Sequence, residues 1–89
     1  MNLNEIYKKI IKKVLSHPKC TGNVKDSLLS LHEAVTKLWI AIATKKEQPE
    51  LEKRIANTII GVCDAAHSLG IKNIEKIISQ RINELELEK

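Results

Sequence analysis

Apolar residues recur at every third or fourth position along most of the chain, which is the spacing of one face of an α-helix. The first run predicts a helix over residues 3–15 that ends at His17-Pro18, because the residue before a proline avoids the helical conformation. After a connector over residues 20–23, a second helix is predicted over residues 24–44. Its apolar positions are Leu28, Leu31, Val35, Leu38 and Ile42, widened by Ala34, Trp39, Ile40, Ala41 and Ala43. A stripe this wide predicts a helix that is buried on more than one side.

Two further helices are predicted in the second half of the chain. The third begins at Pro49, where the missing N–H of proline is tolerated, and Gly70 follows it as the expected C-terminal cap. The fourth begins after Asn73, a residue suited to capping, and is expected to fray over residues 86–89. The apolar positions are Leu51, Ile55, Ile59, Val62, Ala66 and Leu69 in the third helix, and Ile74, Ile77, Ile78, Ile82 and Leu85 in the fourth. Four helices with short turns predict an all-α, four-helix bundle-like fold in one domain over residues 1–89.

Size and composition add three expectations. Aromatic residues make up 2% of the 89 residues while 43% are apolar, so the core must be aliphatic, and a domain this small is marginally stable alone. The net charge of +4 comes from interleaved acids and bases, which is only a weak indication of an anionic partner. Two cysteines, no signal-peptide pattern and no apolar run of roughly 18 residues predict a reducing, cytoplasmic setting without a membrane span.

Three short motifs follow one another, on the second predicted helix, on the third and in the turn before the fourth. Residues 32–37 read His-Glu-Ala-Val-Thr-Lys, residues 54–57 read Arg-Ile-Ala-Asn, and a Gly-Ile step at residues 70–71 precedes the last helix. In order and spacing they resemble the E-E-x-x-E helix, the E-x-x-D helix and the Gly-Ile step of the all-α NTP pyrophosphohydrolases, the MazG-like group that includes phosphoribosyl-ATP pyrophosphohydrolase. The resemblance implies a MazG-type helical fold, a dimer with its sites between packed helices, and Mg²⁺-dependent hydrolysis of nucleoside triphosphates.

The acids of that family are mostly replaced in this chain. Its five acid positions correspond, in order, to Glu33, Ala34, Lys37, Arg54 and Asn57. A shift of one residue places Glu33 second and Thr36 third, but it leaves the E-x-x-D motif without either acid. Asp64, two turns after Asn57, is the next acid on the third helix, and one interpretation pairs it with Glu33 as a vestigial metal site. Surface charge is the commoner role for such residues.

The replacements have a chemical consequence. Mg²⁺ requires hard, anionic oxygen ligands, whereas Lys37 and Arg54 are cations that repel it and bind phosphate instead. If these two cations lie together, Glu33 is the nearest acid to neutralise them, which predicts either an internal salt bridge or a bound anion. The sequence therefore favours a catalytically degenerate protein without a cofactor. We expect it to self-associate as a dimer and to bind a partner or an anionic, phosphate- or nucleotide-type ligand.

Two alternatives retain a metal. The first is an active pyrophosphohydrolase in which Glu33, Asp64 or Glu50 rebuilds the Mg²⁺ site. The second is a zinc site, because His17-x-x-Cys20 and Cys63-x-x-x-His67 together form a Cys/His set of the kind that zinc uses. A buried free cysteine is the commoner outcome for a residue placed like Cys63, beside an apolar stripe.

A third alternative is a basic helical module for nucleic acid. Its basic face would be formed by Lys8, Lys9, Lys12 and Lys13 on the first helix. Tyr7 and Trp39 are the only aromatic residues, so the chain lacks the rows of rings on which unpaired bases stack. An ordinary solvated face is the favoured interpretation of these lysines, and binding to nucleic acid is not expected.

Overall fold

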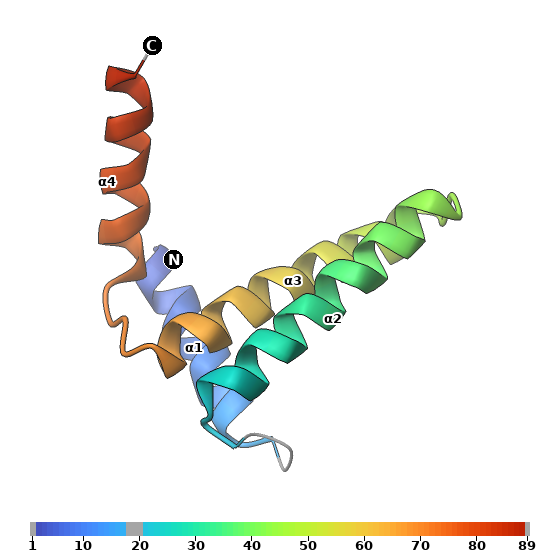
Figure 1. Ribbon diagram of the computed structural model, residues 1–89, viewed down its shortest axis with the longest axis horizontal. Helices are drawn as coiled ribbons and strands as arrows, with labels where there is room; N and C mark the ends of the chain where they lie inside the picture. The colour runs from blue at the N-terminus through green and yellow to red at the C-terminus, as the bar shows by residue number, and fades with distance from the viewer. Residues whose placement is uncertain (1, 18–20, 89) are drawn as a thin grey trace.

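The computed structural model describes residues 2–17 and 21–88, and within these ranges it is all-helical. Figure 1 shows its four helices: α1 (Leu3–Leu15), α2 (Val24–Ala43), α3 (Gln48–Ser68) and α4 (Ile74–Leu87). The predicted all-α class and helix order are confirmed, and two boundaries differ by one residue, since α2 ends at Ala43 and not at Thr44 and α3 begins at Gln48 and not at Pro49. Pro18, Cys20 and Lys89, which entered the predictions above, lie outside the described residues.

Local side-chain chemistry sets where the helices begin. The side-chain oxygens of Asn2, Asn23 and Asn73 accept hydrogen bonds from backbone N–H groups in the first turns of α1, α2 and α4. At the start of α3 Pro49 takes the place of a side-chain cap, since proline has no N–H to leave unpaired. After α3 the chain turns at Gly70, whose φ of 80° is left-handed and favours glycine.

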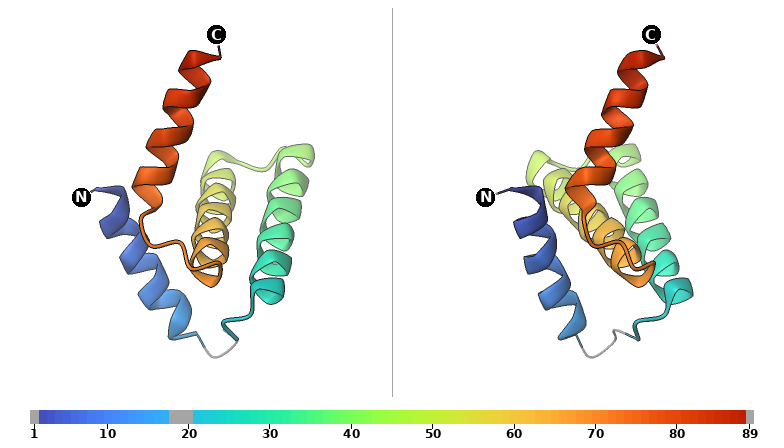
Figure 2. Two further views of the ribbon diagram at one scale, coloured as in Figure 1. Left: turned by 60° about the vertical axis from the view of Figure 1, so that its left-hand side comes forward. Right: turned by 90° about the vertical axis from the view of Figure 1, so that its left-hand side faces the viewer.

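Two of the helices form a hairpin, a third packs against the hairpin, and the fourth is joined to the third. α2 and α3 run antiparallel side by side, α1 packs against α3, and α4 contacts α1. Beyond its first turn α4 points away from the other three helices (Figure 2). None of the helices in the described ranges is long and apolar enough to cross a membrane.

α2 packs on α3 through a row that differs from the predicted stripe. The half-buried or buried positions of α2 are Val24, Ser27, Leu31, Ala34, Leu38 and Ala41. Of the predicted stripe, Leu28, Val35 and Ile42 are exposed, so the expectation that α2 is buried on more than one side is wrong for a single chain. The observed row mixes small residues with leucine, which lets the two helices approach closely. A Cβ atom added to Gly61 would lie 3.3 Å from Leu31 Cα.

The small core lies where α1, α3 and α4 meet. It consists of Tyr7, Ile11, Cys63, Ala66 and Ile74. The Tyr7 hydroxyl donates a 2.6 Å hydrogen bond to the Ile71 carbonyl, which ties α1 to the loop before α4. Asn4 reinforces this joint from α1, because its amide donates to the Asn73 side chain at 3.0 Å and its oxygen accepts the Glu75 N–H at 3.1 Å. The direction in which α4 leaves the body is therefore fixed by hydrogen bonds.

The chain leaves much apolar surface uncovered. Among the described residues no large side chain is completely buried, and Trp39 is 67% exposed. The accessible surface is 7007 Å². A compact monomer of 10.1 kDa is expected to expose about 5,300 Å², so the surplus is about 1,700 Å².

The buried joint predicts a loss of stability at alkaline pH. Burial raises the pKa of the Cys63 thiol, and burial together with the nearby Cys63 raises the pKa of Tyr7. A pKa that is higher in the folded than in the unfolded chain stabilises the fold at neutral pH, and this contribution is lost as pH rises. We therefore expect the free energy of unfolding to fall above about pH 9.

Tyr7→Phe should be less stable at pH 7 by about 1–3 kcal/mol, because the Ile71 carbonyl loses its donor. The free energy of unfolding of this variant should also fall less steeply at alkaline pH, because one of the two titrating groups is gone. Parallel alkaline slopes in urea titrations would refute this.

Candidate functional site

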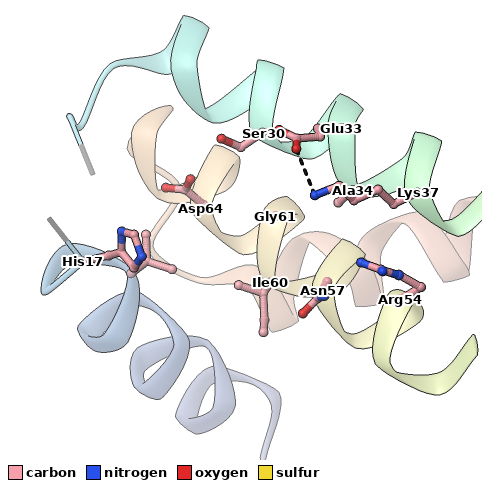
Figure 3. Close-up of a pocket in the computed structure, with 11 residues that line it drawn as sticks. His17, Ser30, Glu33, Ala34, Lys37, Arg54, Asn57, Ile60, Gly61 and Asp64 are labelled. Atoms are coloured by element: carbon pink, nitrogen blue, oxygen red, sulfur yellow. Dashed lines mark ion pairs between the residues drawn. The ribbon is translucent and has the colours of Figure 1, made fainter. Parts of the chain in front are cut away.

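A pocket of about 480 Å³ opens between α2, α3 and the C-terminal end of α1 (Figure 3). It is lined by all six residues that the sequence indicated: Glu33, Ala34, Lys37, Arg54, Asn57 and Asp64. The remaining lining residues are Val14, His17, Ser30, Ile60 and Gly61. One pocket therefore brings together residues from three helices.

Helical spacing explains why these residues meet. On α2 Ser30, Glu33 and Lys37 each lie one position before the row that packs on α3, so they share one side of the hairpin. Arg54 and Asn57 stand on the same side of α3. Because the two helices are antiparallel, Lys37 and Arg54 lie towards one end of the pocket, while Asp64 and His17 lie towards the other (Figure 3).

Each cation of the pocket has an acid partner one turn earlier on its own helix. Lys37 Nζ lies 2.9 Å from Glu33 Oε1, with the two side chains 52% and 66% exposed. Arg54 Nε and Nη2 both lie 2.9 Å from Glu50 Oε1, and this pair is less exposed, at 26% and 35%. Of the two predicted arrangements, the internal salt bridge between Glu33 and Lys37 is present in the pocket. The partner of Arg54 is Glu50, which the prediction did not name.

The exposed ion pair of the pocket is too weak to keep an anionic ligand away from its cation. An exposed Glu–Lys pair at i, i+4 contributes only about 0.3–0.5 kcal/mol, because water screens it and holding two long side chains costs entropy. The Glu33–Lys37 pair is of this kind. An incoming phosphate, with more charge than one carboxylate, can therefore compete for Lys37.

The pocket presents little that would hold a divalent cation. Its carboxylates are Glu33, paired with Lys37, and Asp64, which has no cation within ion-pair distance among residues 2–17 and 21–88. The same residues contain no group of three or more His, Cys, Asp and Glu side chains able to hold a metal ion. Of the proposed zinc set, Cys63 is buried in the core and Cys20 lies outside the described residues.

The sequence alone missed the parts of the pocket that depend on tertiary packing. His17 and Val14 line it because the end of α1 reaches the hairpin, which no local pattern indicates. Gly61 lines it where α3 packs tightly against Leu31 of α2. For the Glu50–Arg54 pair a signal was present, since a glutamate four residues before an arginine is a favourable helix pair.

The pocket has two chemically different ends. Lys37, Arg54 and the Asn57 amide supply N–H donors and positive charge, which suit phosphate oxygens. Asp64 and Ser30, farther along the pocket, suit hydroxyl or amino groups of a ligand. Comparisons of this chain with protein-family models, curated proteins and solved structures find no match.

Proposed function

We propose that this chain is a catalytically degenerate MazG-like helical protein that self-associates and binds an anionic, phosphate- or nucleotide-type ligand in the pocket. The observation that supports this is the shared location of the replaced acid positions. Ala34, Lys37, Arg54 and Asn57, which stand where the MazG-like group has acids, all line one pocket. A site for a metal–phosphate complex that exchanges its carboxylates for cations keeps its attraction for phosphate and loses its attraction for the metal.

The shape and charge of the pocket narrow the ligand class. Its volume of about 480 Å³ is in the range of small-molecule sites. A nucleotide has a phosphate that matches the Lys37–Arg54 end and polar ring or sugar groups that match Asp64. Inorganic phosphate would occupy only the cationic end. The two ligands therefore differ in whether Asp64 contributes to binding.

Binding of an anion should stabilise the fold. We expect phosphate and a nucleoside monophosphate to raise the melting temperature of the wild type, because a ligand that binds only the folded state shifts the unfolding equilibrium. Lys37→Glu with Arg54→Glu should abolish the shift. Lys46→Glu with Lys53→Glu, the same charge change away from the pocket lining, should leave it in place. Thermal melts at constant ionic strength provide the measurement, and an equal shift in all three proteins would argue for a nonspecific salt effect.

We expect no Mg²⁺-dependent pyrophosphohydrolase activity, because only Glu33 remains of the five acids and it is paired with Lys37. Incubation with a panel of nucleoside triphosphates and Mg²⁺ or Mn²⁺ should release no pyrophosphate above a buffer blank. Release that a chelator abolishes, and that Glu33→Gln or Asp64→Asn also lowers, would instead support the enzyme with a rebuilt metal site.

The side of the hairpin opposite the pocket supports the proposal of self-association. On α2 it carries residues one position after the packed row, whereas the pocket residues stand one position before it. The exposed apolar residues of this side, the outer apolar face, are Leu28, Val35, Trp39 and Ile42 on α2, and Ile55, Ile59, Val62 and Leu69 on α3. A helix pair that repeats apolar residues at heptad spacing is suited to pack on an identical pair.

The area argues for a second copy as the occupant. Stable homodimers bury about 2,000 Å² or more in total, and two copies of a chain whose whole surface exceeds that of a compact monomer by about 1,700 Å² can supply such an area. A smaller peptide would leave much of it exposed.

A dimer is therefore expected, with twice the 10.1 kDa mass of the chain in sedimentation or light scattering at micromolar concentration. Val35→Glu with Ile42→Glu should lower the mass towards that of one chain, because it buries two charges in the proposed interface. Thr36→Glu, exposed on α2 outside the outer apolar face, is the control and should remain dimeric. A wild type that stays monomeric to about 100 µM, well above the usual range of specific affinities, would contradict the proposal.

A further inference from the structure

α4 presents an apolar stripe that is about half exposed beyond the first turn of the helix. Ile74 is buried at the joint with α1, but Ile77, Ile78, Ile82 and Leu85 are 40–50% exposed along the part of α4 that projects from the body (Figure 1). An isolated helix of 14 residues is only marginally stable in water. A regular apolar stripe on such a helix indicates that it packs against another surface.

A groove beside α1 has the complementary character. It has a volume of about 460 Å³ and lies between α1 and the loop that precedes α4. Its apolar lining comes from Ile11, Leu15 and Ile71, and its cationic lining from Lys8, Lys12 and Lys72. Within the part of the chain that the structure describes, these lysines form no ion pair. The groove therefore suits an apolar helix edge with acidic neighbours.

α4 matches this groove in charge and length. Residues 74–88 contain four glutamates against one lysine and one arginine, and Glu84 and Glu86 flank the exposed Leu85. Arg81 offsets part of this charge, because it pairs with Glu84 at 2.8 Å and with Glu88 at 3.5 Å. At 1.5 Å per residue, α1 and α4 are both about 20 Å long, so the stripe can follow the groove over its length.

The α4 helix of the same chain is held away from the groove. Its first turn is anchored to α1 by the hydrogen bonds from Asn4 to Asn73 and from the Glu75 N–H to Asn4. The Tyr7–Ile71 hydrogen bond anchors the preceding loop. From this joint α4 runs away from α1 (Figure 2), so folding back onto α1 works against the two hydrogen bonds that Asn4 makes with the start of α4. An α4 helix that occupies the groove therefore comes from another copy of the chain.

We propose that α4 of one copy occupies the groove beside α1 of a second copy, and that the exchange is reciprocal. The inference rests on the self-association proposed above and adds a second, charge-matched contact to it. A two-fold exchange places each acidic α4 on a cationic groove and covers both exposed stripes at once. It also specifies which helix of one copy faces which groove of the other, because opposite charges must meet, whereas an apolar contact alone does not specify this pairing.

Charge reversal tests the exchange through mixing. Lys8→Glu with Lys12→Glu makes a groove variant, and Glu84→Lys with Glu86→Lys makes an α4 variant. Alone, each places like charges in the contact, so its dimer dissociation constant should rise about tenfold or more at low salt. Mixed in equal amounts, the two variants restore opposite charges in both contacts, and a heterodimer with near wild-type affinity should form. Lys9→Glu with Lys13→Glu, the same charge change on α1 outside this groove, is the matched control.

The outcomes separate the two proposals. Circular dichroism first establishes that each variant is helical, and sedimentation equilibrium then gives the dissociation constants. A monomeric wild type would refute self-association and the exchange together. A dimeric wild type whose affinity neither variant changes, with no gain on mixing, would refute the exchange alone. Binding of wild type to phosphatidylserine vesicles that the groove variant loses, without a change in self-association, would assign the groove to a membrane surface and likewise overturn the exchange.

Discussion

The close approach of α2 and α3 is the constraint on which the rest of the structure depends. The row between them alternates leucine with serine and alanine, and at Gly61 the helices come so near that an added methyl group would press on the Leu31 backbone. A narrow contact covers only one row of each helix. The positions on either side of that row therefore remain uncovered, one set forming the polar pocket and the other the outer apolar face.

The sequence predicted the helices well but the packing of α2 only in part. Helix order and boundaries follow from local signals such as Asn73, Pro49 and Gly70, and the structure agrees with them. Leu31 and Leu38 of the predicted α2 stripe do pack on α3, but Leu28, Val35 and Ile42 do not. The positions that pack beside the two leucines are the less hydrophobic Ser27, Ala34 and Ala41. Hydrophobicity ranks residues by their gain on burial, but in this hairpin small size decides which face fits.

The grouping of the pocket residues was easier to predict than the packed row of α2. Glu33 and Lys37 are four residues apart, and Arg54 and Asn57 are three apart, so each pair lies on one face of its helix. When α2 and α3 pack with these faces on the same side, all four side chains meet in one pocket. The contribution of α1 was not predictable, because His17 reaches the pocket only through the packing of Tyr7 and Ile11 on α3. Local spacing thus indicates which side chains share a face, and tertiary packing decides what closes over them.

We propose that the fold of one chain is completed by a second copy. The dependence of unfolding on protein concentration tests this most directly, because unfolding of a dimer into two chains shifts with concentration whereas unfolding of a monomer does not. Urea denaturation at about 1 µM and about 100 µM should give a higher urea midpoint at the higher concentration. The midpoint shift multiplied by the denaturant slope m should be close to RT ln 100, or about 2.7 kcal/mol per dimer. Identical midpoints at the two concentrations would contradict the account.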